Sequence, residues 1–269
     1  MTPTPSSPLR RLLDRQVPWL YRPVRSVWQS YQARRFDRRY RRLIKYVTGS
    51  GGWTVQTGVF RDMQYVAEAR CSALLPKLLG TYEAEIADEM ERAIGVGYRL
   101  IIDIGCAEGY YAIGMARRSC NSEVWAYDTE QLSRTLCERM ATMNTVSDRV
   151  KVFGAFIEDS VESVPAEQRF FVICDVEGYE STLFTPSVAM AWREADLVIE
   201  LHDHLGHPCR EPVLAAFAAT HAARLLDSRV RSHADIKLPP KMSEKDRNLC
   251  VDELRQPQQW VILRSRRHL

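Results

Sequence analysis

The chain has 269 residues, of which 45% are hydrophobic, so it is long enough for one α/β domain with a sizeable core and an extension. It lacks any run of about 18 apolar residues and the apolar centre of a secretory signal, so we expect a cytoplasmic protein. The seven cysteines never occur in C-x-x-C spacing, which argues against a disulfide framework and a thiolate zinc site.

Charge is distributed unevenly along the chain. Residues 1–50 contain twelve Lys and Arg against two Asp, whereas the other 219 residues contain 25 basic and 32 acidic residues. Two regions with different partners are therefore expected. We predict a basic helical extension over residues 1–52, disordered at its start, and a globular domain over residues 53–269.

The extension interleaves arginines with aromatic residues, of which Trp28 and Tyr31, and Phe36 and Tyr40, are spaced as on one helical face. A basic amphipathic helix over residues 9–47 suits an anionic membrane surface, a polyanion such as nucleic acid, or docking on a partner with its arginines in water. The glycine-rich stretch 48–52 predicts a hinge after it.

Residues 53–99 carry weaker signals. We predict a short strand at 54–60, an apolar turn at 74–80 and a helix over 82–94 that Thr81 caps. Because this helix leads into the next strand, it should lie over the ligand cleft. Tyr82 and Glu83 are therefore candidate cofactor contacts.

The centre of the sequence is an isoleucine-rich run at 100–104, followed by Gly105 and Gly109 and then a helical pattern. The run is typical of a strand buried on both faces, and the glycines allow a tight turn that brings the N–H groups of the new helix to a ligand. A dinucleotide fingerprint would need glycine where the chain has Ala107 and Tyr110, and a P-loop Gly-Lys-Ser/Thr is also absent.

Similar apolar runs follow at 123–128, 150–154, 170–175 and 196–202, with a helix expected at 131–144. Several of these runs end in an acid, and Asp128 has the spacing of a residue that bonds ribose hydroxyls. The pattern predicts a Rossmann-like, doubly wound and mostly parallel α/β sheet. Beyond it we expect a helix at 212–226, a strand at 228–236, a loop at 237–258 that covers the acceptor site, and a closing strand at 259–264.

The segments D-x-G-x-x-x-G at 103–109, D-V-E-G-Y-E at 175–180 and V-I-E-L-H at 198–202 together resemble the FkbM family of class I S-adenosylmethionine-dependent methyltransferases. The resemblance covers roughly residues 80–205. It implies a seven-stranded sheet, S-adenosylmethionine as cofactor, and O-methylation of a sugar, glycan or natural-product hydroxyl. The residues that it places at the cofactor are Asp103, Gly105, Glu108, Tyr110, Asp128, Ala155 and Phe156.

Transfer of a methyl group to a hydroxyl requires that the hydroxyl lose its proton. The candidates for this step stand at two strand ends and are Asp175, Glu177, Glu200 and His202. Asp175, His202 and Asp203 could instead hold a divalent Mg²⁺ or Mn²⁺ ion, or the group could be structural polar packing.

Two other functions stay open: an RNA methyltransferase that uses the basic extension, and a nicotinamide-dependent oxidoreductase. The expected partners are a small-molecule or glycan hydroxyl acceptor and, through residues 9–47, an anionic membrane or polyanion. A homo-oligomer is compatible with the sequence.

Overall fold

The computed structural model describes residues 18–70, 72–164, 168–203, 208–229, 231, 233, 234, 236, 238 and 242–269, with the side chains of 18–32, 50, 51, 158 and 159 left aside. The disordered start expected at residues 1–8 lies outside these ranges. Among the helices of the described residues, none is both long enough and apolar enough to cross a membrane.

Seven strands of the described residues form one sheet in the order β3-β2-β1-β4-β5-β7-β6. Their bounds are β1 Leu100–Ile104, β2 Glu123–Tyr127, β3 Val150–Phe153, β4 Phe171–Cys174, β5 Asp196–Leu201, β6 His221–Asp227 and β7 Gln259–Ser265. Strands β1 to β5 pair in parallel, and β7 runs antiparallel to both β5 and β6. The predicted mostly parallel, doubly wound sheet is confirmed.

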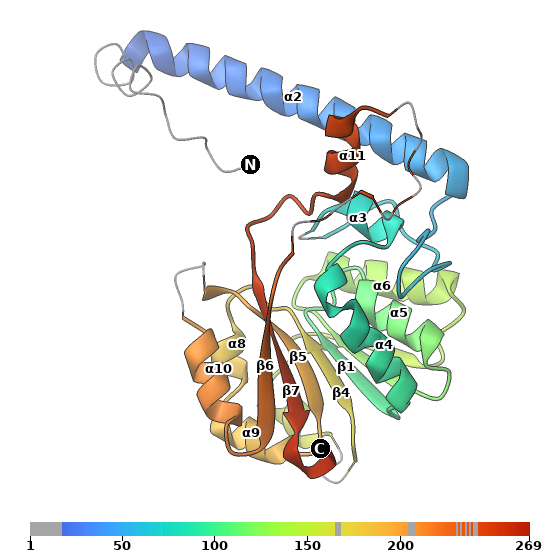
Figure 1. Ribbon diagram of the computed structural model, residues 1–269, viewed down its shortest axis with the longest axis vertical. Helices are drawn as coiled ribbons and strands as arrows, with labels where there is room; N and C mark the ends of the chain where they lie inside the picture. Colours follow the sequence, from blue (N-terminus) through green and yellow to red (C-terminus); the bar gives the residue numbers. More distant parts are fainter. Residues whose placement is uncertain are drawn as a thin grey trace.

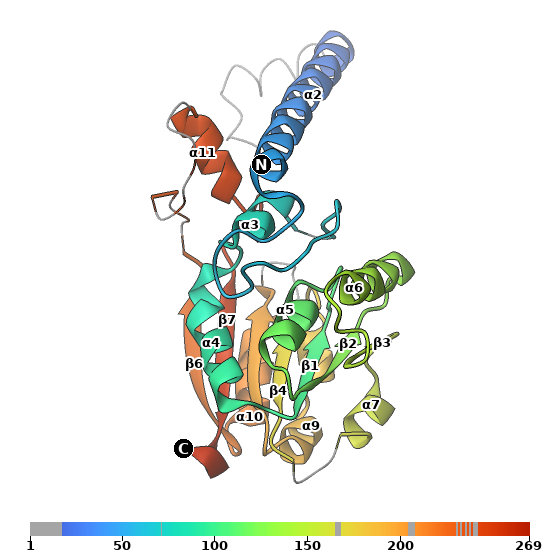
Figure 2. The ribbon, with the colours of Figure 1, turned by 90° about the vertical axis from the view of Figure 1, so that its right-hand side faces the viewer.

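Helices cover both faces of the sheet (Figures 1 and 2). The helices are α2 Pro18–Gly51, α3 Leu74–Leu79, α4 Ala87–Val96, α5 Tyr110–Arg118, α6 Gln131–Met143, α7 Glu158–Glu162, α8 Glu180–Leu183, α9 Pro186–Ala191, α10 Arg210–Phe217 and α11 Glu244–Val251, with short 3-10 turns η1 Ala84–Ile86 and η3 Arg266–His268. Alternate residues of the central strands enter different cores, because successive side chains point to opposite faces. In β1, Ile101 joins the core of α4, α5 and α6, while Ile102 joins the core that contains Trp192 and Phe217.

Helix α2 runs without interruption and lies across one end of the molecule, beside α3 and α11 (Figure 1). Leu43 and Val47 on this helix are each 3% exposed and belong to the core, and the Tyr40 hydroxyl accepts a hydrogen bond from the Leu75 N–H at 3.1 Å. The hinge expected at 48–52 is therefore wrong, since the helix continues to Gly51. The boundary expected at residue 52 divides residues that share one core.

Some of the weaker predictions before residue 100 are also wrong. The strand expected at 54–60 is reduced to one bridge between Thr54 and Gln64. The turn expected at 74–80 is helix α3, which Gly80 ends in a left-handed conformation. Thr81 caps no helix, because a 3-10 turn intervenes and α4 begins only at Ala87.

In the C-terminal part, the edge strand β6 occupies residues where a helix was expected. The helix expected over 212–226 ends at Phe217, and β6 begins at His221. This strand is alanine-rich and largely exposed at the edge of the sheet, so its own sequence carries little strand pattern and its pairing with β7 decides its structure. The strand expected at 228–236 is not found among the residues described there, and α11 occupies part of the expected loop.

Candidate active site

The carboxyl ends of β1, β2, β4 and β5 lie along one edge of the sheet, where ligands bind in open α/β folds. The structure therefore brings Asp103, Asp128, Asp175 and the end of β5 to the same edge, as the sequence predicts. The site has two halves: the glycine turn after β1 with the end of β2, and the ends of β4 and β5.

Gly105 holds the two halves together. It has φ +85°, and a Cβ at this position would lie 1.7 Å from the backbone oxygen of Asp175. Any side chain here would collide with the chain after β4, so Gly105 is required for the packing of the turn itself.

Two carboxylates shape the turn through backbone hydrogen bonds. Asp103 is buried, and its Oδ2 accepts from the N–H of Ala112 in the first turn of α5 at 2.8 Å. Burial raises the pKa of Asp103 to about 8, although the bond from Ala112 opposes this rise. Asp128 accepts from the N–H of Ala107 at 2.9 Å and from that of Glu130 at 2.7 Å. Both acids hold the turn in one conformation.

Glu108, predicted to contact the cofactor, is completely buried among protein groups. Its carboxylate accepts hydrogen bonds from the Lys77 ammonium at 2.6 Å, the Arg70 N–H at 2.9 Å and the Tyr65 hydroxyl. Burial alone would raise the pKa of Glu108, but Lys77 and these bonds outweigh burial and lower it. Glu108 thus ties the glycine turn to the segment before α4.

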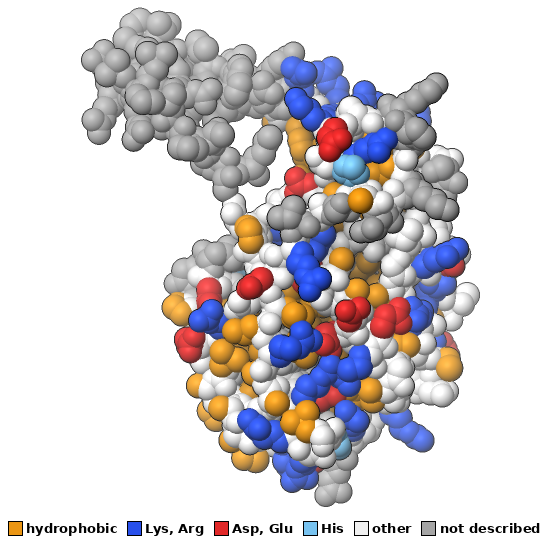
Figure 3. All heavy atoms as spheres, in the orientation of Figure 1, with side chains coloured by type: hydrophobic (Ala, Val, Ile, Leu, Met, Phe, Trp, Pro, Cys, Tyr) orange, Lys and Arg blue, Asp and Glu red, His pale blue; other side chains and the backbone are white. Residues whose placement is uncertain are grey.

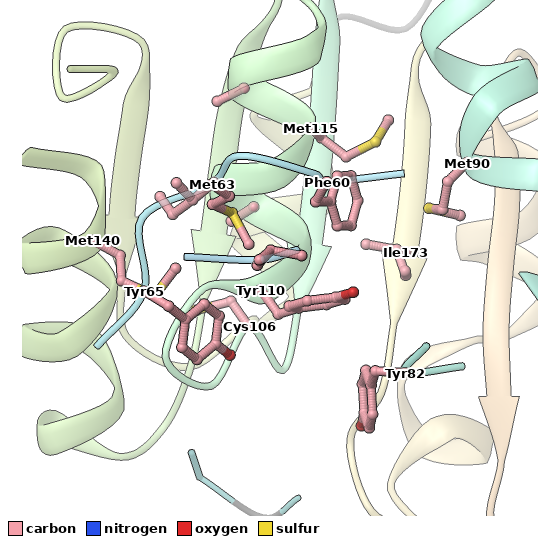
Figure 4. Close-up of a cluster of buried hydrophobic side chains, with 14 of the residues drawn as sticks. Phe60, Met63, Tyr65, Tyr82, Met90, Cys106, Tyr110, Met115, Met140 and Ile173 are labelled. Atoms are coloured by element: carbon pink, nitrogen blue, oxygen red, sulfur yellow. The ribbon is translucent and has the colours of Figure 1, made fainter. Parts of the chain in front are cut away.

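Tyr110 and Tyr82 form an aromatic wall beside the turn. Figure 4 shows Tyr65 and Tyr110 on either side of Cys106 of the turn, and their ring centroids are 6.2 Å apart. The ring of Tyr82 packs edge-on against Tyr110 at 5.4 Å, with the Lys77 ammonium 4.8 Å from its centroid. These contacts fix the wall within the core, because both rings are nearly buried.

Glu83 is buried with φ +47° and pairs with Arg255 at 2.7 Å, while the Tyr111 hydroxyl donates to its other oxygen. Burial raises the pKa of Glu83 to about 7, and Arg255 limits the rise. Its carboxyl group connects the wall to the half of the site that β5 forms, because Arg255 also pairs with Glu200 at 2.9 Å.

After β3, the two residues predicted to enclose adenine differ in environment. Ala155 is exposed, whereas Phe156 is 9% exposed and packs edge-on against Tyr127 and Trp192. Phe156 therefore forms part of the second core and leaves little of its surface for a ligand.

His202 lies at the centre of the second half, completely buried just beyond the end of β5. Its Nδ1 is 2.6 Å from Oε1 of Glu180, which is equally buried. This contact assigns the N–H to Nδ1 in the neutral ring and turns Nε2 toward Asp175 at 3.4 Å and Glu200 at 3.7 Å. Burial lowers the pKa of His202, but Glu180 and Asp175 outweigh burial and raise it.

Three ligand atoms, one each from Asp175, Glu200 and His202, lie within 4.8 Å of one another. Asp175 Oδ1 and Glu200 Oε2 are buried and have no hydrogen-bonding partner among the described residues. Burial, and then the charge of Asp175, raise the pKa of Glu200. The half of the site at β4 and β5 therefore gathers several carboxyl groups around one imidazole.

Of the two other predicted site residues, Asp203 is turned away from this cluster, whereas Glu177 lies at its edge. Asp203, expected as a metal ligand, instead accepts from the N–H groups of Cys209 at 2.6 Å and Arg210 at 3.0 Å at the start of α10. The structure therefore places Glu200, not Asp203, beside Asp175 and His202. Glu177 has φ +51° and a half-exposed side chain, with Oε2 3.6 Å from His202 Nε2.

A cleft of about 470 Å³ lies beside Arg255, the residue that pairs with Glu200. Among the residues that line it are Arg229, Arg231, Asn248, Glu253, Arg255 and Gln256. Arg255 reaches from the cleft to Glu200 and Glu83, so the cleft borders the group that surrounds His202.

Sequence reasoning gave no role to Lys77, Glu180 or Arg255. Glu180 carried a signal, since it is the last acid of the D-V-E-G-Y-E segment. No sequence pattern indicated Lys77 or Arg255, because the residues that each of them pairs with are far away in the sequence.

No protein-family model matches the chain, and no curated protein matches it. Among solved structures, geranyl diphosphate C-methyltransferase from Streptomyces coelicolor has a TM-score of 0.46 at 12% identity, covering 72% of this chain and 82% of that one. An O-methyltransferase from Bacillus cereus scores 0.42 at 12% identity over 84% and 90%. Precorrin-6y C5,15-methyltransferase from Geobacter metallireducens scores 0.42 at 11% identity over 66% and 88%. At such low sequence identity and TM-score, these structures indicate neither the substrate nor the reaction of this chain.

Proposed function

We propose that this protein is an S-adenosylmethionine-dependent O-methyltransferase that acts on a hydroxyl of a small molecule or glycan. The observation that carries the proposal is the cluster of Asp175, Glu200 and His202 at the carboxyl edge, beside a glycine turn that two acids hold through backbone hydrogen bonds. An FkbM-like assignment rests on the D-V-E-G-Y-E segment, in which Asp175, Glu177 and Glu180 all face His202.

The first half of the site suits a cationic nucleoside better than a pyrophosphate. The charge of Glu108 in the turn is balanced by Lys77, and the N–H of Ala107 is directed at Asp128. The remaining acids, Asp103 and Asp128, favour the sulfonium and ammonium groups and the ribose hydroxyls of S-adenosylmethionine. When bound, this cofactor would supply a methyl group to the acceptor oxygen, and S-adenosylhomocysteine would leave as the bond between sulfur and methyl breaks.

In this proposal the second half accepts the proton. Glu180 orients His202 and stabilises the imidazolium that forms, and the carboxyl group of Asp175 lies near Nε2. His202 must be neutral to act as a base, so the rate should rise with pH through a pKa above the ordinary histidine value. The acceptor occupies the adjacent cleft, which offers amide, guanidinium and carboxylate groups to its hydroxyls.

A divalent ion is the other way to remove the proton. The donor set of two carboxylates and one imidazole, with two buried oxygens that lack partners, fits Mn²⁺ or Mg²⁺. Asp175, Glu200 and His202 would hold the ion, which would lower the pKa of a bound hydroxyl. Glu180 would then act by fixing the ligating ring.

Calorimetric titration with S-adenosylhomocysteine and with NAD tests the cofactor, and transfer of labelled methyl to glycans, small-molecule alcohols and tRNA tests the reaction. We expect binding of S-adenosylhomocysteine only, and label on a hydroxyl compound. Binding of NAD without S-adenosylhomocysteine would contradict the proposal, and label on tRNA alone would favour the RNA alternative. Chelation distinguishes the two proton routes, because it stops transfer only if an ion takes part.

A further inference from the structure

The basic surface of helix α2 has no role in the proposed reaction. Figure 3 shows Lys and Arg side chains gathered at the end of the molecule that the described part of α2 forms. The helix meets α3 and α11 on one side, where Leu43 and Val47 are buried. The charged side chains of α2 therefore differ in role according to the face of the helix that they occupy.

Two of the arginines fix the helix to the domain. Arg39 and Arg42 lie within 2.6 Å and 3.4 Å of the carboxylate of Asp246 on α11. They lie between the buried face and the outer face of the helix, and Asp246 is shared by both. These two charges belong to the attachment of α2.

Four further cations form a row on the outer face: Arg34, Arg38, Arg41 and Lys45. Their spacing of i, i+4, i+7 and i+11 places them on one side of the helix, roughly opposite Leu43. All four are exposed. Only Arg41 pairs with a described acid, Asp37, at 2.5 Å. Like charges at this spacing repel one another, so an anion bound from outside would relieve the repulsion.

The neighbouring aromatic residues decide which kind of anion fits. Phe36 and Tyr40 stack on each other at 5.8 Å and pack against the core, so they are not a platform for nucleic-acid bases. The apolar face of this part of the helix is covered by α3 and α11, so the helix cannot insert into a bilayer. What remains is a straight row of cations that can lie flat against a charged plane.

We propose that this row binds the surface of an anionic lipid bilayer through electrostatic attraction to its headgroups. The outer row would face the headgroups while Arg39 and Arg42 keep the helix fixed to the domain. Each Lys or Arg near such a surface strengthens binding about 5-fold, so three of them contribute about 100-fold.

The test is co-sedimentation of the full-length protein with vesicles of phosphatidylcholine, with and without phosphatidylglycerol. The variant Arg34→Gln/Arg38→Gln/Lys45→Gln should bind the anionic vesicles about 100-fold more weakly. The matched control is Arg99→Gln/Arg139→Gln/Arg266→Gln, which removes three exposed charges elsewhere and should change binding far less. The unfolding temperature should match that of the unmodified protein in both variants.

Binding should also disappear at about 1 M salt, where the Debye length is about 3 Å. Equal losses in the two triple variants would overturn the proposal, as would equal binding to neutral vesicles. Tighter binding of double-stranded RNA than of anionic vesicles at the same phosphate concentration would also overturn it and assign the row to nucleic acid. None of these outcomes depends on the methyltransferase assignment.

Discussion

The two halves of the candidate site use their acids in opposite ways. Around the glycine turn, Asp103, Glu108 and Asp128 all accept hydrogen bonds from backbone N–H groups, and Lys77 balances the charge of Glu108. At the ends of β4 and β5, Asp175 and Glu200 keep buried oxygens without a partner among the described residues. Carboxylates whose oxygens are hydrogen-bonded fix the conformation of the backbone, whereas buried carboxyl oxygens without a partner attract a proton or a cation. The first half of the site therefore suits the positioning of a ligand, and the second half suits the reaction.

The largest expected effect tests the first half as a structural unit. Lys77→Met leaves the buried carboxylate of Glu108 without its counter-charge, so we expect the free energy of unfolding to fall by about 3–5 kcal/mol. The matched control is Lys151→Met, which breaks an exposed pair with Glu123 and should cost at most about 1 kcal/mol. Urea denaturation measures both, and equal stabilities would show that the Lys77–Glu108 pair does not hold the turn.

The second half should respond in turnover instead of stability. Asp175→Asn and His202→Ala should each lower turnover by about 100-fold or more, because each removes a group next to the acceptor hydroxyl. Affinity for S-adenosylhomocysteine should stay within a few-fold in each variant. His268→Ala, on the distant C-terminal 3-10 turn, is the control. Full activity of both site variants in single-turnover assays would place the reaction elsewhere.

The same division explains what could be predicted from the sequence. The strand ends and their acids follow from local pattern, because apolar runs define the buried strands and the acids follow them directly. This is how Asp103, Asp128, Asp175 and Glu200 could be placed at one edge. The seven strands and the mostly parallel sheet followed from the family resemblance and are confirmed.

What could not be predicted depends on side-chain pairs between distant segments. Lys77 reaches Glu108 across 31 residues and Arg255 reaches Glu200 across 55, and no local pattern records either pair. The direction of a single side chain is also hidden, which is why Asp203 was expected beside His202 although it faces the start of α10. Strand β6 was missed because an edge strand depends on its partner more than on its own residues.

A smaller effect, on cofactor affinity, is expected at Asp128, the proposed ribose ligand in the first half of the site. Asp128→Ala should weaken binding of S-adenosylhomocysteine by about 10- to 150-fold, the value of a hydrogen bond to a charged group. Asp128→Asn retains one oxygen that can accept from the Ala107 N–H and so keeps the turn in place. Comparison of the two variants therefore distinguishes loss of the ribose contact from disorder of the turn. Calorimetry measures both affinities, and an unchanged affinity in the Ala variant would exclude Asp128 as the ribose ligand.

The smallest effect is a pH dependence of cofactor binding that comes from Asp103. Burial raises its pKa to about 8, so the free protein carries this carboxyl mostly protonated at pH 7. A cationic cofactor favours the ionised form, and binding below pH 8 must therefore release a proton. Affinity for S-adenosylmethionine should rise about tenfold between pH 7 and pH 9, since one pKa unit corresponds to a factor of ten.

Methylthioadenosine, which lacks the sulfonium and the amino-acid end, should bind without this dependence. Calorimetry in two buffers of different ionisation enthalpy detects the released proton directly. If Asp103→Asn retained the pH dependence, the carboxyl group of Asp103 would not be its source, and its role would be limited to the hydrogen bond with Ala112.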